Sequence, residues 1–182
     1  MVQRAVIGVD PGRKTGAVAV IEQGGAVIRV CKNFAKDDDE GDLLGGESVS
    51  LMREYQGRAV AVVERIPPFM FSFNPITKQK ERKPMHGNVV RHYGAVLGCL
   101  QGLRIPIIQL TPAWWQTVMN CRTGGNKRIS KDRATELFDL KVSFRITDWN
   151  SDALLLAACG WRLMRGEARI NGMADPRGLW PC

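Results

Sequence analysis

The chain has 182 residues, a formal net charge of +8 and a pI near 9.6, and 45% of its residues are hydrophobic. This length suits a single domain, and no segment reaches the roughly 20 apolar residues that a membrane-spanning helix needs. The N-terminal residues are too mixed for a signal peptide. The five cysteines contain no C-x-x-C pair, which argues against a zinc knuckle and a disulfide framework. We therefore expect a cytoplasmic protein with reduced thiols.

The charges of the chain are unevenly distributed along the sequence. Acidic residues cluster at 37–42, whereas basic residues gather at 77–92 and 122–133. Segregated positive charge of this kind favours a polyanionic partner, and nucleic acid is the first candidate. The alternative is an ordinary solvated surface.

Short apolar segments rich in β-branched residues predict five strands. These segments are residues 2–9, 15–22, 26–34, 59–64 and 105–110. The Gly24-Gly25 pair between the second and third segments is a hairpin signal. The first three strands should therefore pair as an antiparallel unit.

Helical spacing of apolar residues and helix-start signals predict the helices. We expect helices over 48–56 and 87–103, from Thr111-Pro112, after a cap at Ser130, and from Asp148 or Ser151. Residues 65–86 show no clear period and predict a long loop. Gly94 and Gly98 lower the helix propensity of 87–103, and such glycines usually permit close packing.

The order of these elements is typical of an α/β, ribonuclease H-like fold. We expect a five-stranded mixed sheet in the order 3-2-1-4-5, flanked by helices, over residues 1–165, followed by a C-terminal tail over 166–182. In that arrangement the first and fourth predicted strands are adjacent.

Acidic residues stand at the ends of the apolar segments that should converge. Asp10 ends the first strand and Glu64 ends the fourth, while Asp148 and Asp152 lie four positions apart at the start of the last helix. Carboxylates gathered in a low-dielectric site repel one another and need a counter-cation, for which Mg²⁺ is suited. Two such ions about 4 Å apart would support phosphodiester hydrolysis. Taken singly, these acids also fit a turn, a surface charge and a helix cap.

Several ordered motifs resemble the RuvC-type Holliday-junction resolvases, especially their shorter, phage-encoded branch. The matching segments are GVDPGRKTGAVAV, VVERIPPF, HYGAVLGCLQGL, IPIIQLTPAWW, SKDRATELF and SDALLLAACG, within residues 6–161. The resemblance implies a homodimer in the cytoplasm of a bacterium or a phage-infected cell. It would bind four-way DNA junctions, with other branched DNA as further candidate substrates, and nick two symmetric strands during recombination and repair. The cofactor would be Mg²⁺, with Mn²⁺ as a substitute.

The same resemblance implies roles for individual residues. Asp10, Glu64 and Asp152 match the metal-binding acids, and Asp148 is assigned as the fourth, with Asn150 as its alternative. Lys131 matches a basic position that stabilises charge on the scissile phosphate, which completes the expected catalytic set.

The segment after Glu64 has the composition of a DNA-contacting surface. Aromatic residues beside cations allow base stacking together with phosphate contacts. The expected DNA-binding residues are Phe69, Phe71, Phe73, Lys78, Lys80, Arg82 and Lys83, and a second cluster at Lys127 and Arg128. The resemblance adds that one aromatic, Phe69 first, wedges into the junction centre. The alternatives are a buried strand for the phenylalanines and a solvated loop for the cations.

Some assignments stay open at this stage. Helix 89–103 is the expected dimer interface, or else it only packs on the sheet. Trp114 and Trp115 are expected in the core, with support of the acidic site as the alternative. Two rival functions are a junction-binding protein with a vestigial site and an actin-like or sugar-kinase-like phosphotransferase. The latter normally needs two such domains.

Overall fold

The computed structural model describes residues 4–12, 16–25, 28–32, 44–74, 76, 78–124, 126–139, 141–170 and 178, with the backbone alone for 70–74. The acidic cluster at 37–42 lies outside these residues.

One mixed sheet forms the centre of the described part of the chain. Its five strands lie in the order β3-β2-β1-β4-β7. They are β1 (Ala5–Asp10), β2 (Ala17–Glu22), β3 (Ile28–Lys32), β4 (Ala59–Glu64) and β7 (Ile107–Leu110). The pairs β1–β2 and β2–β3 are antiparallel, while β1–β4 and β4–β7 are parallel. The predicted fold class and strand order are confirmed, with β7 as the predicted fifth strand.

A short 3-10 turn, η1 (Gln23–Gly25), joins β2 to the segment before β3. Gly24 and Gly25 have φ values of 84° and 72°, a region that side chains with a Cβ rarely adopt. The glycine pair therefore makes the predicted tight turn possible.

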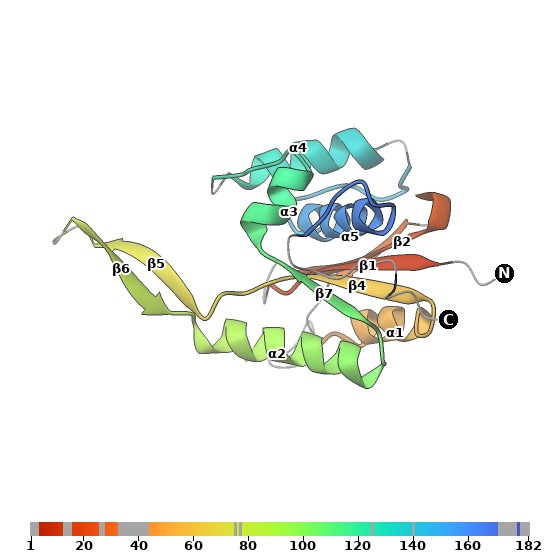
Figure 1. The fold of residues 1–182 in the computed structure, drawn as a ribbon, viewed down its shortest axis with the longest axis horizontal. Coiled ribbons are helices and arrows are strands. Elements are labelled where there is room, and N and C mark those ends of the chain that lie inside the picture. The colour runs from red at the N-terminus through yellow and green to blue at the C-terminus, as the bar shows by residue number, and fades with distance from the viewer. Residues whose placement is uncertain are drawn as a thin grey trace.

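Helices cover both faces of this sheet (Figure 1). The helices are α1 (Gly46–Glu54), α2 (Gly87–Gly102), α3 (Pro112–Val118), α4 (Lys127–Phe138) and α5 (Ser151–Met164). Side chains of α1 and α2 share a core with one face of the sheet, and α5 and α4 belong to the core on the other. Among the described helices, none combines the length and apolar character that crossing a bilayer would require.

One predicted helix start is wrong. The cap expected at Ser130 lies four residues earlier, at Asn126, and α4 begins at Lys127. The Asn126 side chain accepts a hydrogen bond from the Arg128 backbone N–H at 3.1 Å. Ser130 is instead buried inside α4. The last helix begins at Ser151, one of its two expected starts, and leaves Asp148 in the preceding turn.

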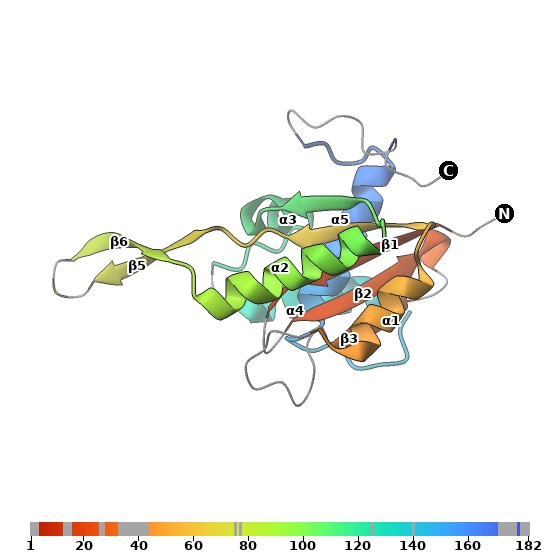
Figure 2. The same cartoon turned by 90° about the horizontal axis from the view of Figure 1, so that it is seen from below.

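The long loop predicted for residues 65–86 is also wrong, because this segment contains a β-hairpin. Strands β5 (Phe69–Asn74) and β6 (Gln79–Pro84) form a separate antiparallel pair. Its register sets Phe71 opposite Arg82 and Phe73 opposite Lys80. The hairpin projects from the body beyond the end of β4, as both views show (Figures 1 and 2).

The alternation of side chains along β1 and β4 directs the acids toward α5. Along β1, Ile7 and Val9 belong to the core beneath α1 and α2, whereas Val6 belongs to the core beneath α5. Since successive side chains point to opposite faces of a sheet, Gly8 and Asp10 share the α5 face with Val6. The same alternation along β4 places Glu64 on that face.

Helix α5 lies unusually close to β1 at Gly8. A Cβ atom at this position would lie 2.1 Å from the Ala153 backbone oxygen and 2.4 Å from the Ala157 backbone nitrogen. Gly160 makes a second close approach, where a Cβ would lie 2.5 Å from a Val6 methyl group. These contacts hold the start of α5 over the end of β1.

Candidate active site

The sheet register brings the first two acids to neighbouring positions. Val9 pairs with Val63 across the parallel β1–β4 contact, so Asp10 and Glu64 are the next residues of adjacent strands. Both stand at the carboxyl edge of the sheet, where parallel α/β sheets commonly bind ligands. The predicted neighbourhood of the first and fourth strands is therefore present.

The third acid comes from α5 and completes the wall of one cavity. Asp152 lies in the first turn of α5, which the Gly8 contact holds against β1. The cavity has a volume of about 190 Å³. It is lined by Asp10, Glu64, Pro112, Gln116, Thr123, Lys127 and Asp152.

Each acid has a different set of polar neighbours. The Gly12 backbone N–H donates to Asp10 Oδ1 at 3.0 Å, and the Trp115 indole Nε1–H donates to Glu64 Oε2 at 2.8 Å. Lys127 Nζ lies 4.0 Å from Asp152 Oδ2. Among the described residues, Asp152 Oδ1 and the nearby Ser130 hydroxyl are both buried and have no hydrogen-bond partner.

Burial is the largest cause that raises the pKa of all three carboxyl groups. For Asp10, burial and then the charge of Asp152 raise the pKa to about 6, against the lowering effect of Lys127 and the Gly12 N–H. For Glu64, burial and then the charge of Asp10 raise the pKa to about 7, while the Trp115 indole lowers it. Burial also raises the pKa of Asp152, opposed first by Ser130. Ionisation of these three carboxyl groups is therefore unfavourable near neutral pH when no cation is bound.

We expect the metal-free protein to lose stability as the pH rises through this range. Between about pH 4 and pH 7 the folded chain binds more protons at Asp10 and Glu64 than the unfolded chain does, so the slope of stability against pH is negative. The shift at Glu64 corresponds to about 3 kcal/mol. With EDTA at pH 8, Glu64→Gln should therefore melt roughly 5 °C or more above the wild type.

Thermal unfolding at pH 4 and pH 8, with EDTA or Mg²⁺, measures this effect. The difference between the two proteins should vanish near pH 4, and Mg²⁺ should stabilise the wild type more than Glu64→Gln. Glu47→Gln, at an exposed position in α1, is the matched control. Equal melting temperatures of wild type and Glu64→Gln at pH 8 would show that the ionised Glu64 carboxylate does not destabilise the folded protein.

The donor set fits a hard divalent cation. It consists of carboxylate oxygens, which are the ligands that Mg²⁺ prefers. One of them, Asp152 Oδ1, is buried and has no hydrogen-bond partner among the described residues. Among the described residues, no three carboxylate, histidine or cysteine groups are yet close enough to form a ready-made metal cluster. The acids thus surround a common cavity, and binding a cation would require them to move closer together.

The remaining predicted catalytic residues lie outside the cavity wall. Asp148 is exposed in the turn before α5, and its charge contributes to the raised pKa of Asp152. Asn150 accepts from the Thr147 N–H at 2.8 Å and donates to the Arg145 carbonyl at 3.1 Å. Its amide is therefore engaged within the loop, which favours Asp148 as the fourth acid. Lys131 is half-buried one turn beyond Lys127 and does not line the cavity.

The predicted DNA-contacting residues fall on the hairpin and on α4. Phe69 is 37% exposed, and the Arg82 guanidinium lies 3.6 Å from its ring centroid. The cations predicted to contact DNA are all exposed: Lys78, Lys80, Arg82, Lys83, Lys127 and Arg128. The side chains of Phe71 and Phe73 lie outside the described part of the structure, so their expected DNA contacts stay predictions.

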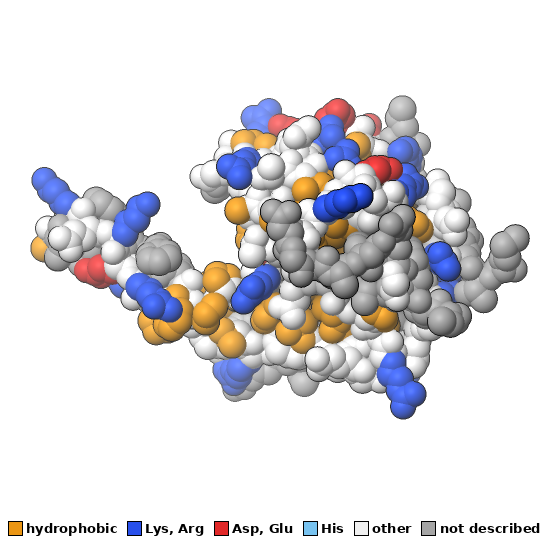
Figure 3. All heavy atoms as spheres, in the orientation of Figure 1, with side chains coloured by type: hydrophobic (Ala, Val, Ile, Leu, Met, Phe, Trp, Pro, Cys, Tyr) orange, Lys and Arg blue, Asp and Glu red, His pale blue; other side chains and the backbone are white. Residues whose placement is uncertain are grey.

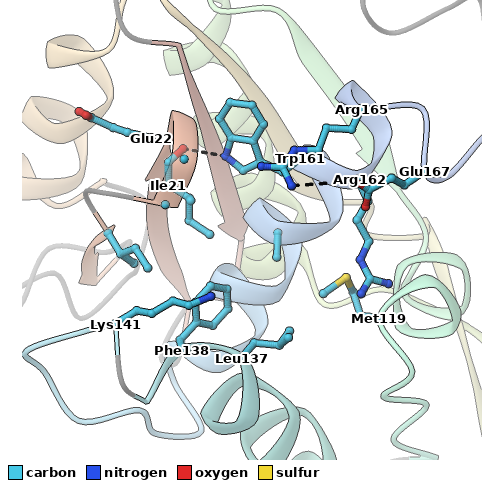
Figure 4. Close-up of a pocket in the computed structure, with 14 residues that line it drawn as sticks. Ile21, Glu22, Met119, Leu137, Phe138, Lys141, Trp161, Arg162, Arg165 and Glu167 are labelled. Atoms are coloured by element: carbon cyan, nitrogen blue, oxygen red, sulfur yellow. Dashed lines mark hydrogen bonds and ion pairs between the residues drawn. The ribbon is translucent and has the colours of Figure 1, made fainter.

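A larger cavity, of about 370 Å³, lies at the opposite end of the sheet (Figure 4). Ile21 lines it, and the register pairs Ile21 with Val6, near the start of β1 and far from Asp10. Two of its polar side chains are engaged with backbone: the Trp161 indole N–H donates to the Ile21 carbonyl at 2.9 Å, and Arg162 donates to the Val118 carbonyl at 2.7 Å. Larger volume alone does not make it the reactive site.

Two residues of the cavity wall, Gln116 and Thr123, were not identified by sequence reasoning. Lys127, expected in a DNA-contacting basic cluster beside the proposed site, borders the acids. Trp115 belongs to the core, as predicted, and also supports the site, which had been the alternative. The Thr-Pro-x-x-Trp motif was the signal available for this position.

Comparison with known proteins supports the fold. No protein-family model and no curated protein matches the chain. The solved structure of RuvC from Thermus thermophilus is 20% identical with a TM-score of 0.56, covering 91% of this chain and 98% of that one. The T. thermophilus RuvC complex with a Holliday junction substrate is 17% identical with a TM-score of 0.53, at the same coverage of 91% and 98%. The chain therefore has the ribonuclease H-like fold of RuvC.

Proposed function

We propose that the chain is a metal-dependent DNA endonuclease that recognises branched DNA and resolves four-way junctions. The observation that carries the proposal is the shared cavity of Asp10, Glu64 and Asp152, which come from β1, β4 and α5. It lies at the carboxyl edge of a fold shared with RuvC, one of whose solved structures holds a Holliday junction substrate. The same arrangement supports phosphodiester hydrolysis better than simple DNA binding, for which strained buried acids are unfavourable.

The chemistry follows from the charges of the cavity. When bound, a pair of divalent cations supplies an activated water and charge stabilisation for the leaving oxygen. Asp10, Glu64 and Asp152 would hold those cations, with Asp148 as the fourth acid. Lys127 would contact the phosphate beside Asp152, because its ammonium group borders the cavity and 53% of the side chain is exposed. Lys131 would stabilise charge from the next turn of α4.

The hairpin provides a surface that suits DNA beside this cavity. It continues directly from Glu64 through residues 65–68, so its base starts at the reactive edge of the sheet. Lys and Arg side chains lie on the hairpin and on the body across the hollow between them (Figure 3). The Phe69 ring, backed by Arg82, is the proposed wedge at the junction centre.

Removing two hairpin cations should weaken junction binding in a salt-dependent way. Lys80→Ala combined with Lys83→Ala should lower affinity about tenfold or more and reduce the slope of log affinity against log salt by about 2. Binding titrations at several salt concentrations measure both quantities. Arg53→Ala, an exposed cation on α1, is the control and should change neither. An unchanged slope in the double variant would remove the hairpin from the DNA interface.

Helix α2 offers the surface for the proposed homodimer. Val90 is 44% exposed, and Cβ atoms added at Gly94, Gly98 and Gly102 would meet no atom within 4 Å. Figure 3 shows hydrophobic side chains along this helix. A two-fold dimer would present two cavities to a roughly two-fold junction. Sedimentation of the purified chain reports the oligomeric state directly, and a monomer at working concentration would contradict the dimer.

The decisive experiment incubates the purified chain with a synthetic four-way junction and Mg²⁺. We expect paired nicks in strands of like polarity, and no cleavage with EDTA. Binding without cleavage in either Mg²⁺ or Mn²⁺ would instead identify a junction-binding protein with an inactive site. ATP turnover with a small-molecule acceptor would indicate a phosphotransferase.

A further inference from the structure

A buried tryptophan contacts one of the proposed metal-binding acids from behind. Trp115 has 0% exposure, and its indole Nε1–H donates to Glu64 Oε2 at 2.8 Å. Glu64 lines the cavity, but Trp115 does not. The indole therefore lies on the protein side of the carboxylate, where it cannot touch a substrate in the cavity.

The backbone that places Glu64 also places this indole. Glu64 pairs with Leu110 in the parallel β4–β7 contact. The chain then turns at Thr111, Pro112 begins α3, and the Trp115 backbone N–H donates to the Thr111 carbonyl at 3.2 Å. One helical turn after the end of β7 thus returns the Trp115 side chain to the strand that carries Glu64.

We propose that Trp115 is a positioning residue that holds Glu64 in the orientation required for cation binding. Its N–H engages Oε2 and restrains the side-chain rotamer, which leaves Oε1 as the oxygen that the indole does not engage. This inference rests on the proposed function, because it assigns Glu64 to a cation.

A neutral donor suits this role better than a charged one. The cavity already contains three carboxylates, and a lysine or arginine behind Glu64 would compete with a cation for its charge. An indole N–H orients the carboxylate without neutralising it. Partners of this kind commonly change metal affinity or activity by about 10–100-fold when they are removed.

The neighbouring tryptophan offers a matched control. Trp114 is adjacent in α3, half-buried, and packs against the same core as Trp115. It lines a different cavity, with Thr117 and Arg122, and in the described part of the structure it makes no hydrogen bond with an acid of the reactive site. Trp114→Phe therefore removes the same atoms from the same helix but leaves the Glu64 contact intact.

Calorimetric titration with Mg²⁺ alone, without DNA, tests the inference. We expect Trp115→Phe to weaken Mg²⁺ affinity about 10–100-fold and Trp114→Phe to leave it within twofold of the wild type. In a Glu64→Gln background, Trp115→Phe should cause no further loss, because the two residues act as one unit. Equal Mg²⁺ affinity in wild type and Trp115→Phe would overturn the proposal, and so would equal losses in the two tryptophan variants.

A second variant covers the case in which Trp115→Phe fails to fold. Replacing Trp115 with 3-benzothienylalanine keeps the bicyclic shape and exchanges the indole N–H for sulfur. It should fold and lose Mg²⁺ affinity, whereas wild-type affinity in this variant would show that Trp115 only fills space. Wild-type protein that binds no Mg²⁺ and leaves junctions uncut would contradict the proposed function itself. Wild-type protein that binds Mg²⁺ and cuts junctions, together with a Trp115 variant of unchanged Mg²⁺ affinity, would contradict only the role of Trp115.

Discussion

Glu64→Gln should abolish junction cleavage while junction binding persists. The substitution keeps the size of the side chain and an oxygen that can accept from the Trp115 indole, but removes the negative charge from the cavity. Without that charge the cations required for hydrolysis bind weakly and out of position, so the single-turnover cleavage rate should fall at least about 1,000-fold, or about 4 kcal/mol.

Two assays separate the chemical step from binding in this variant. Single-turnover cleavage with Mg²⁺ measures the loss of rate, and a titration in Ca²⁺ measures junction affinity, which should stay within a few-fold of the wild type. Glu47→Gln is the control, because its carboxylate is exposed on α1. Cleavage by Glu64→Gln within tenfold of the wild-type rate would contradict the assignment of the cavity as the reactive site.

Gly8→Ala should destabilise the fold more than any single change in the surface helices. The added methyl group would meet backbone atoms of Ala153 and Ala157 at 2.1 and 2.4 Å, and backbone cannot rotate away as a side chain can. Helix α5 would have to move off β1. We expect a loss of about 3 kcal/mol or more, a large part of the stability of an ordinary domain.

Urea unfolding compares this variant with a matched glycine. Gly46→Ala in α1 adds the same methyl group where no atom lies within 4 Å, and it should be neutral or stabilising by up to about 1 kcal/mol. A Gly8→Ala protein as stable as the wild type would mean that α5 does not approach β1 this closely. The contact also matters for chemistry, because it holds Asp152 beside Asp10.

The positions of Asp10 and Glu64 were predictable because they depend on short-range patterns. Each ends a run of β-branched residues, and the order of elements indicates that the two strands are parallel neighbours. The structure confirms the pairing through Val9 and Val63. A strand over the phenylalanines had been the alternative interpretation, and β5 contains them. Its partner β6 was missed for a physical reason: β6 is mostly exposed, so its sequence lacks the alternation that marks a half-buried strand.

Helix starts show a similar limit. Both Asn126 and Ser130 are plausible caps by residue type, and propensity does not choose between them. Packing decides, since Ser130 faces the buried side of α4 near Asp152 and becomes an interior helix residue.

The amino-acid order by itself determined the five strands of the central sheet, their order across it and the acids at two strand ends, because period and chain order are local properties. Only the tertiary structure decided which groups surround those acids: the Trp115 indole behind Glu64, Lys127 rather than Lys131 at the cavity, and Asn150 within its loop. These choices depend on how α3, α4 and α5 approach the ends of β1 and β4. Such approaches are set by the packing of distant segments, which no local pattern encodes.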